Sequence, residues 1–233
     1  NCTIYTATDH FQYWESSEWE INMPYIVKFE NTKIESGCPD LMWQGITLNG
    51  SDNSLQSANA HVELENSSIS DAIQAIKTYG GATASLRNSE FYNNEYDIYI
   101  DNAQHGDFEF YRNVFETNSR LKNQLRYPIA HVYMFKGRNI IFRGNTFRNT
   151  LAFDIPGYDT QNRGTGIYSL TSSFTVTPVS NTYMMPTLPF STNSFEGLYY
   201  GISAKMENTY APRIHRNTFT NNYRGVHLVA VTA

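Results

Sequence analysis

A six-residue pattern recurs seven times along this chain of 233 residues. Each copy begins with a large apolar residue, has Asn two or three positions later, and ends with Phe or Ile at the fifth position after the start. The final residues of successive copies are 35, 22, 24, 32, 48 and 24 positions apart, so the base period is 22–24 residues and the longer steps contain insertions. A fixed period of this size indicates a solenoid, in which each repeat forms one turn of a stacked wall. The copies are Phe29-Asn31-Ile34, Leu64-Asn66-Ile69, Leu86-Asn88-Phe91, Phe110-Asn113-Phe115, Phe142-Asn145-Phe147, Phe190-Asn193-Phe195 and Ile214-Asn217-Phe219.

A second element follows each copy and alternates between apolar and polar residues, which is typical of a half-buried strand. We align its seven occurrences at Gly45-Ile46, Ala72-Ile73, Asp97-Ile98, His131-Val132, Gly166-Ile167, Gly201-Ile202 and Gly225-Val226. In a stack of such coils, the Phe and Ile residues form one internal ladder, and the Asn residues form another at a turn. In the second element, the residue after each Ile or Val is in the polar position of the alternation. These residues are Thr47, Gln74, Tyr99, Tyr133, Tyr168, Ser203 and His227.

Tyrosines on three successive coils predict an aromatic strip on the outer face, at Tyr99, Tyr133 and Tyr168. Aromatic faces dock against sugar rings and other flat apolar faces, so we interpret the strip as a ligand-binding surface. The alternative is that the three rings pack on one another or under the insertions, as cross-strand aromatic pairs do.

The composition favours β-structure and argues against several classes of partner. Charged residues make up 17% of the chain, compared with about 25% in an average domain. The chain has 24 Asn and 12 Leu, and Asn suits turns because it tolerates left-handed backbone geometry. A net charge of −5 without a basic run argues against a nucleic-acid partner. The sequence also contains no apolar run long enough to predict a membrane span.

The last repeat and one earlier segment resemble a known family. Residues 217–228 read Asn-Thr-Phe-Thr-Asn-Asn-Tyr-Arg-Gly-Val-His-Leu, and bacterial β-helix repeats often read N-x-F-x-N-N-x-x-G-I-x-L. Residues 42–46, Met-Trp-Gln-Gly-Ile, are similar to the M-W-x-G-I string that opens β-helix regions in secreted bacterial surface proteins. Over roughly residues 25–233, the chain therefore resembles the right-handed parallel β-helix of the pectate-lyase-like superfamily. This resemblance implies an all-β, right-handed parallel β-helix solenoid of about seven coils with loop insertions, secreted or displayed on a bacterial surface.

Two of the insertions leave successive coils from the same edge, at residues 116–127 and 149–164, so we expect them to lie side by side. Loops on a rigid scaffold commonly carry function, and we take Arg126, Tyr158, Asp159 and Arg163 of this pair as candidate ligand-binding residues. Residues 119–126 are interpreted as a short helix whose leucines face the wall. The other insertions are placed after the second strand, at residues 50–58, 101–106 and 171–189.

Both ends of the chain carry a prediction. Residues 1–24 contain several aromatic side chains and are interpreted as a cap, with the β-helix over 25–233. Because the chain stops just after a strand, we expect a longer protein or another chain to cover the last coil. Cys2 and Cys38 lie near the first coils, where a disulfide would tie them together in an oxidising compartment; two buried thiols are the alternative.

The sequence leaves three hypotheses for function. The catalytic strings of the pectate-lyase and polygalacturonase branches are missing, and the residue spacings predict no catalytic, metal or cofactor site. We therefore expect a module for adhesion, glycan binding or scaffolding, whose partner is a glycan or another surface protein. The second hypothesis is a polysaccharide lyase or glycoside hydrolase of this superfamily. The third is a purely structural spacer in a surface assembly.

Overall fold

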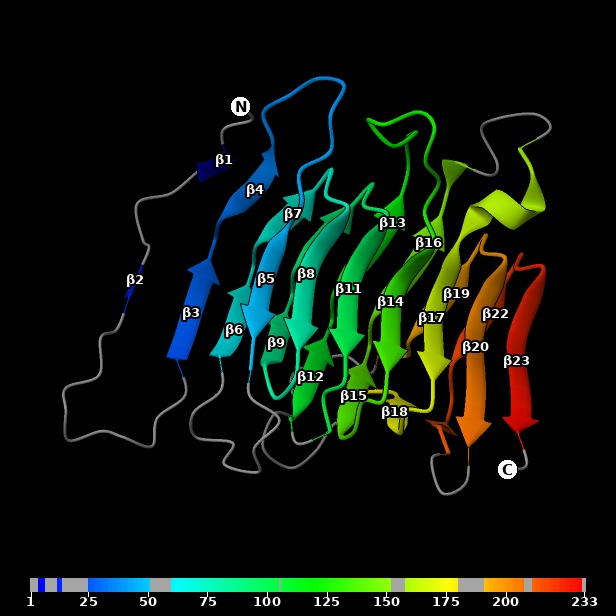
Figure 1. Ribbon diagram of the computed structural model, residues 1–233. Helices are drawn as coiled ribbons and strands as arrows, with labels where there is room; N and C mark the ends of the chain where they lie inside the picture. Colours follow the sequence, from blue (N-terminus) through cyan, green and yellow to red (C-terminus); the bar gives the residue numbers. More distant parts are fainter. Residues whose placement is uncertain are drawn as a thin grey trace, which may run out of the picture.

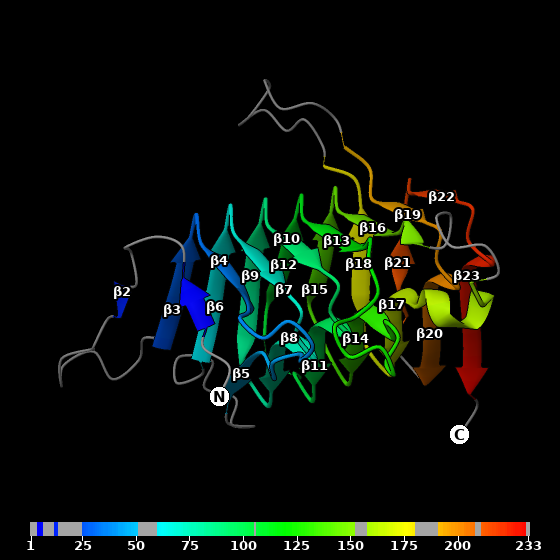
Figure 2. The ribbon, with the colours of Figure 1, turned by 90° about the horizontal axis from the view of Figure 1, so that it is seen from above.

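The computed structural model describes residues 4–6, 12–13, 25–50, 60–104, 106–151, 158–179, 191–207 and 211–231. The strands of this part of the chain belong to three sheets, and each turn of the chain adds one strand to each sheet. Seven such coils stack side by side, from coil 1 (β3–β5) at one end to coil 7 (β21–β23) at the other (Figures 1 and 2). The coils pair in parallel, which confirms a parallel β-solenoid of about seven coils.

The bounds of the strands follow from the three sheets. The first sheet contains β2 (Gln12–Tyr13), β3 (Tyr25–Glu30), β6 (Ala60–Glu65), β9 (Thr83–Arg87), β12 (Phe108–Tyr111), β15 (Ile140–Arg143), β18 (Phe174–Thr177) and β21 (Arg213–Ile214). The second contains β1 (Ile4–Thr6), β4 (Lys33–Ser36), β7 (Ser68–Ser70), β10 (Glu90–Tyr92), β13 (Val114–Thr117), β16 (Thr146–Asn149), β19 (Ser194–Glu196) and β22 (Thr218–Thr220). The third contains β5 (Ile46–Asn49), β8 (Gln74–Tyr79), β11 (Tyr96–Asp101), β14 (Ala130–Phe135), β17 (Thr165–Leu170), β20 (Tyr200–Glu207) and β23 (Arg224–Val231).

The predicted Phe and Ile ladder is the spine of the core. Its members are in register across the whole second sheet: Ile34, Ile69, Phe91, Phe115, Phe147, Phe195 and Phe219. The five phenylalanine rings stack with their centroids 4.7–5.0 Å apart. This spacing equals the distance between neighbouring strands, so a repeated Phe automatically places ring on ring.

Asn occurs in the repeat for two different reasons. Two positions after the start, Asn31, Asn66 and Asn88 have φ near +50°, a left-handed turn that Asn tolerates. Three positions after the start, the Asn side chains are turned inward and form a hydrogen-bonded ladder of Asn113, Asn145, Asn193 and Asn217. The ladder continues toward the N-terminal end through Thr32, Ser67 and Ser89, each of which is also buried.

Two details of the predicted alignment are wrong. In coil 2, Ile76 rather than Ile73 lies between Ile46 and Ile98, so Lys77 replaces Gln74 on the outer face. In coil 6, the first strand is β18, and Val176 occupies the ladder position that we assigned to Phe190. The insertion predicted at 171–189 therefore contains a strand, and the extra residues lie between β18 and β19; Phe190 itself falls outside the described residues.

The described parts of the predicted cap lie against the first coil. Strand β1 pairs antiparallel with β4, and β2 pairs antiparallel with β3, so both cover an edge of the stack. The other residues of the predicted 1–24 cap lie outside the described part, and its role stays a prediction. Cys38 is disulfide-bonded. Cys2, its predicted partner, also lies outside the described residues.

Candidate functional site

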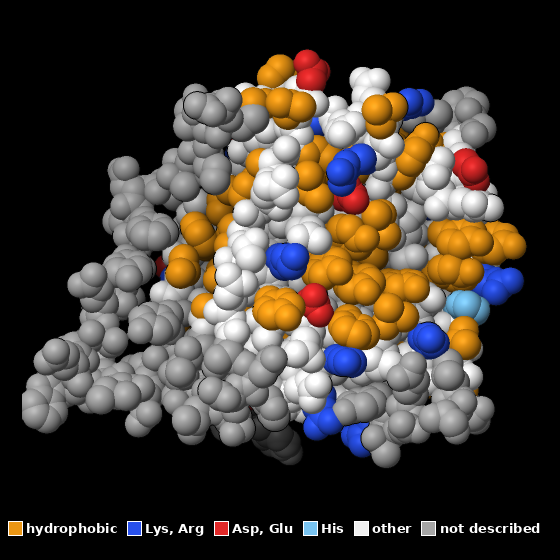
Figure 3. Space-filling view, in the orientation of Figure 1, with side chains coloured by type: hydrophobic (Ala, Val, Ile, Leu, Met, Phe, Trp, Pro, Cys, Tyr) orange, Lys and Arg blue, Asp and Glu red, His pale blue; other side chains and the backbone are white. Residues whose placement is uncertain are grey.

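The predicted tyrosine strip lies on the outer face of the third sheet. Tyr99 pairs with Tyr133, and Tyr133 pairs with Tyr168, so the three side chains occupy equivalent positions on β11, β14 and β17. Each of the three is half-buried. Figure 3 views this face and shows hydrophobic side chains gathered across the same three strands.

The rings of the strip are stacked on one another. The centroids of Tyr99 and Tyr133 lie 4.5 Å apart with an interplanar angle of 16°, and those of Tyr133 and Tyr168 lie 5.7 Å apart at 17°. On the other side of Tyr99, the Lys77 ammonium lies 5.4 Å from the ring centroid. Both faces of Tyr133 are therefore covered, and this ring offers its edge and its hydroxyl to a ligand rather than a face.

A fourth tyrosine, which the sequence pattern did not single out, completes the strip. Tyr96 packs edge-on against Tyr99 and Tyr133, with ring centroids 5.3 and 6.0 Å apart. It reaches the outer face because Asp97 and Ile98, the next two residues of β11, are both turned inward. Burial raises the pKa values of Tyr96 and Tyr133 to about 12, so their hydroxyls remain neutral hydrogen-bonding groups at physiological pH.

The described parts of the two paired insertions lie side by side, as predicted from their common edge. Together they line a pocket of about 290 Å³, whose walls include three of the four candidate residues, Arg126, Tyr158 and Asp159. The Tyr127 and Tyr158 rings meet edge-on across it, with centroids 6.4 Å apart. Arg163 is the last residue of the 3₁₀ helix η2 (Thr160–Arg163), and its backbone oxygen accepts a hydrogen bond from the Asn149 amide.

Roles within this pocket differ from residue to residue. The Asp159 carboxylate accepts a hydrogen bond from the Gln161 backbone N–H and so caps the short helix. Arg126 forms an ion pair with the buried Glu95, which comes directly before Tyr96 of the strip. The guanidinium of Arg126 therefore lies where the pocket meets the tyrosine strip, and the two candidate surfaces form one continuous region.

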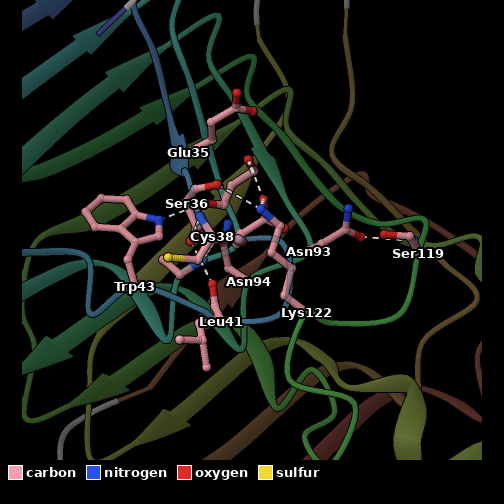
Figure 4. A network of polar contacts seen from close by, with 12 residues as sticks. Glu35, Ser36, Cys38, Leu41, Trp43, Asn93, Asn94, Ser119 and Lys122 are labelled. Carbon is pink, nitrogen blue, oxygen red and sulfur yellow. Dashed lines mark hydrogen bonds and ion pairs between the residues drawn. The ribbon is translucent and has the colours of Figure 1, made fainter. Parts of the chain in front are cut away.

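Lys122 is one of the residues that hold the first insertion against earlier coils (Figure 4). Lys122 Nζ lies 3.0 Å from Asp71 Oδ2 and donates to the Ser36 backbone oxygen at 2.8 Å. The predicted helix over 119–126 is wrong, because this segment forms turns. Leu121 packs into the wall with 2% of its surface exposed, whereas Leu125 points outward and is 91% exposed.

A buried carboxylate and a histidine lie beneath the strip, and the sequence analysis missed their pairing. Asp97 and His131 occupy the same extra inward position in coils 3 and 4, with His131 Nδ1 2.6 Å from Asp97 Oδ2. The Asn94 amide donates to Asp97 Oδ1 at 2.8 Å. In coils 5 and 6 this position is Gly166 and Gly201, where a Cβ would lie 2.5–2.6 Å from the backbone oxygen of the next coil. Coils 5 and 6 therefore have no room for a side chain at this position, whereas in coils 3 and 4 the side chains of Asp97 and His131 occupy it.

We expect this pair to make stability depend on pH. Burial raises the pKa of Asp97, and the contacts with His131 and Asn94 lower it only in part. The stabilising contribution of the protonated carboxyl is fully present below the unfolded pKa of 3.8 and is lost as pH rises through the higher folded pKa. Asp97→Asn removes this titration, so the stability of the variant relative to wild type should increase as pH rises from 3.8 through the higher folded pKa of Asp97. Urea-unfolding midpoints across this range test the expectation, and parallel curves for the two proteins would contradict it.

No cluster of three or more His, Cys, Asp and Glu side chains suited to a metal ion is found in the ranges described above. In the same ranges, no helix has the length and apolarity needed to cross a membrane.

Comparison with known proteins identifies the family. The family described as the right handed beta helix region matches residues 1–183. No curated protein and no solved structure matches the chain. The family match covers most of the chain and agrees with the three stacked parallel sheets, and it establishes the predicted handedness. The chain therefore belongs to the right-handed β-helix family.

Proposed function

We propose that this β-helix is a secreted or cell-surface module that binds a glycan or another surface protein without catalysing a reaction. The observation that carries the proposal is the alignment of Tyr99, Tyr133 and Tyr168 on three successive coils. Their stacked rings place the three hydroxyls in a row on a rigid wall. Such a row suits a ligand that extends along the stack and bonds to several coils at once.

The pocket between the insertions adds charged and polar groups beside this row, at the edge where β14 and β17 begin. Arg126 and Asp159 offer groups of opposite charge, and Tyr127 and Tyr158 add aromatic surface beside them. A ligand lying on the strip would reach this pocket through Arg126. The pocket volume of about 290 Å³ suits one sugar unit or one side chain of a partner.

Coil 7, the last described coil, exposes apolar side chains that suit a second contact surface. Val226 and Leu228 of β23 are 41% and 48% exposed, whereas their partners Ile202 and Ala204 in coil 6 are buried. We propose that further coils or another chain cover this side of coil 7, since apolar ladder positions are buried elsewhere in the stack.

Tyr133→Phe tests the proposed role of the strip, because it keeps the stacked ring and removes only the hydroxyl. We expect it to weaken glycan or protein binding at least about tenfold, which corresponds to about 1.4 kcal/mol. Tyr133→Ala should weaken binding further. The matched control is Tyr111→Ala, which removes a half-buried tyrosine from the outer face of the first sheet.

The measurement is a glycan array and a polysaccharide-digestion assay on the same protein sample. Binding without cleavage, lost in Tyr133→Phe and kept in Tyr111→Ala, is the expected result. Release of reducing or unsaturated ends, abolished by Arg163→Ala, would instead establish a lyase or glycosidase. Absence of any signal with glycans and with candidate surface proteins would favour a structural spacer.

A further inference from the structure

The row of stacked tyrosines is interrupted after coil 5. Tyr168 of β17 is paired with Ser203 of β20, and Ser203 is paired with His227 of β23. The outer position thus carries a ring in coils 3, 4, 5 and 7 and a small hydroxyl side chain in coil 6. One ring is missing from an otherwise continuous aromatic row.

The interruption leaves one aromatic face of the row uncovered. Tyr133 stacks on one side of Tyr168. Within the described residues, no second ring stacks on its other side, because Tyr200 of coil 6 lies on His227 instead, with ring centroids 4.9 Å apart at 12°. The far face of Tyr168 is therefore the place in the strip where a ligand ring can stack face to face.

A pocket of about 280 Å³ occupies this position. Its lining includes two adjacent outer rows, the first of Tyr168, Ser203 and His227, and the second of Leu170, Lys205 and Val229. Tyr200, which stacks on His227, lines it as well. Tyr200 covers the side of His227 that faces coil 6, at about one strand spacing, so the space left for a flat ring is the one next to Tyr168 and Ser203.

The lining favours an aromatic ring over a sugar. Leu170 and Val229 contribute apolar surface, and the Ser203 hydroxyl is already engaged with His227 Nδ1 at 3.4 Å. A sugar ring packed against these apolar groups would lose water from hydroxyls that gain few protein partners in exchange. An aromatic ring needs no such partners and continues the stack at a spacing of about 4.5–7 Å.

We propose that this pocket, which we call the Ser203 pocket, binds one aromatic side chain of a protein partner. The inference rests on the proposed binding function of the wall and specifies the chemistry of the partner. A protein rather than a free aromatic compound is favoured because the pocket lies on the same outer face as the tyrosine hydroxyls. A partner anchored by its ring would then have polar groups within reach of the strip.

Ser203→Tyr tests the proposal, because it supplies the missing ring from within the chain. We expect a higher thermal midpoint from the added stacking and at least a tenfold loss of affinity for N-acetyltryptophanamide, measured by calorimetric titration. Ser203→Ala keeps the pocket open and should bind this probe as the wild type does. If Ser203→Tyr does not fold, Ser203→Leu fills the pocket with a smaller side chain, and probe-induced shifts of the Val229 methyl NMR signals report binding to the wild type.

Three results would overturn the proposal. The first is equal binding of N-acetyltryptophanamide by the wild type and by the filled variant, and the second is a wild type that does not bind it at millimolar concentration. The third is preferential binding of another probe: methyl β-glucoside would indicate a sugar, and indole without N-acetyltryptophanamide would indicate a free aromatic compound. A wild type that binds glycans but not N-acetyltryptophanamide would refute the Ser203 pocket alone. The reverse result would support the pocket and leave the strip without a glycan role.

Discussion

Phe147→Ala is expected to lower the free energy of unfolding by about 3–5 kcal/mol. The side chain is fully buried and stacks on Phe115 and Phe195, with centroids 4.9 and 4.7 Å away. It also meets Phe142 edge-on at 6.1 Å. Removing the ring opens a cavity in the middle of the stack, where the neighbouring coils are held by strand pairing and cannot close it.

Phe219→Ala is the matched control for this substitution. Phe219 belongs to the same ladder, but it lies in coil 7 and is only partly buried. It stacks on Phe195 alone, so its loss should cost about half as much or less. Chemical denaturation of the two variants measures the difference, and equal destabilisation would show that the ladder is not the spine of the core.

Asn145→Ala is expected to destabilise the protein by about 3 kcal/mol or more, through buried polar groups left without partners. Its side-chain oxygen accepts from the Asn113 backbone N–H at 2.9 Å, and its amide donates to the Phe110 backbone oxygen at 2.8 Å. The same amide reaches Asn193 at 3.2 Å. None of these groups has access to water, because Asn145 and its neighbours in the ladder are fully buried.

Asn145→Ser separates hydrogen bonding from packing. Ser67 and Ser89 fill the equivalent position in coils 2 and 3, where each hydroxyl donates to the backbone oxygen two residues earlier. Each also accepts from the backbone N–H of the preceding coil. We therefore expect Asn145→Ser to recover part of the stability lost in Asn145→Ala. Equal loss in both variants would indicate that amide packing, rather than hydrogen bonding, explains the ladder.

The repeat pattern predicted the ladders well because it records the same structural position many times. A solenoid requires that equivalent residues of each coil lie one strand spacing apart, so a recurrent Phe identifies a ring stack without any knowledge of tertiary contacts. The tyrosines at 99, 133 and 168 were aligned by the same argument, and the strand register agrees with it.

The ladder positions that we assigned wrongly lie where the sequence pattern fits more than one set of residues. Residues 72–75 and 75–78 both read as a small residue followed by Ile, and the second set is the one in register with the neighbouring coils. Ala72 instead forms an isolated bridge with Trp43 at the preceding turn. In coil 6 the pattern favoured Phe190 over Val176 because it requires a constant distance to the next Phe, whereas the chain places its extra residues within that interval.

The insertions were the least predictable part of the candidate site. Residues 119–126 have leucines at helical spacing, but so short a segment gains too little from its own hydrogen bonds to form a helix. Its conformation follows from contacts with distant residues, such as that of Lys122 with Asp71. The pairing of Asp97 with His131 was likewise hidden, because strand alternation does not anticipate two consecutive inward residues.

The sequence by itself determined the period, the coil number and the Phe and Ile ladder of the second sheet, because these properties repeat with every turn of the chain. The tertiary structure decided which groups remain available to a ligand. It covered both faces of Tyr133 with neighbouring rings, left one face of Tyr168 open beside Ser203, and brought Arg126 to the edge of the strip. These outcomes depend on side-chain packing between coils, which no single repeat contains.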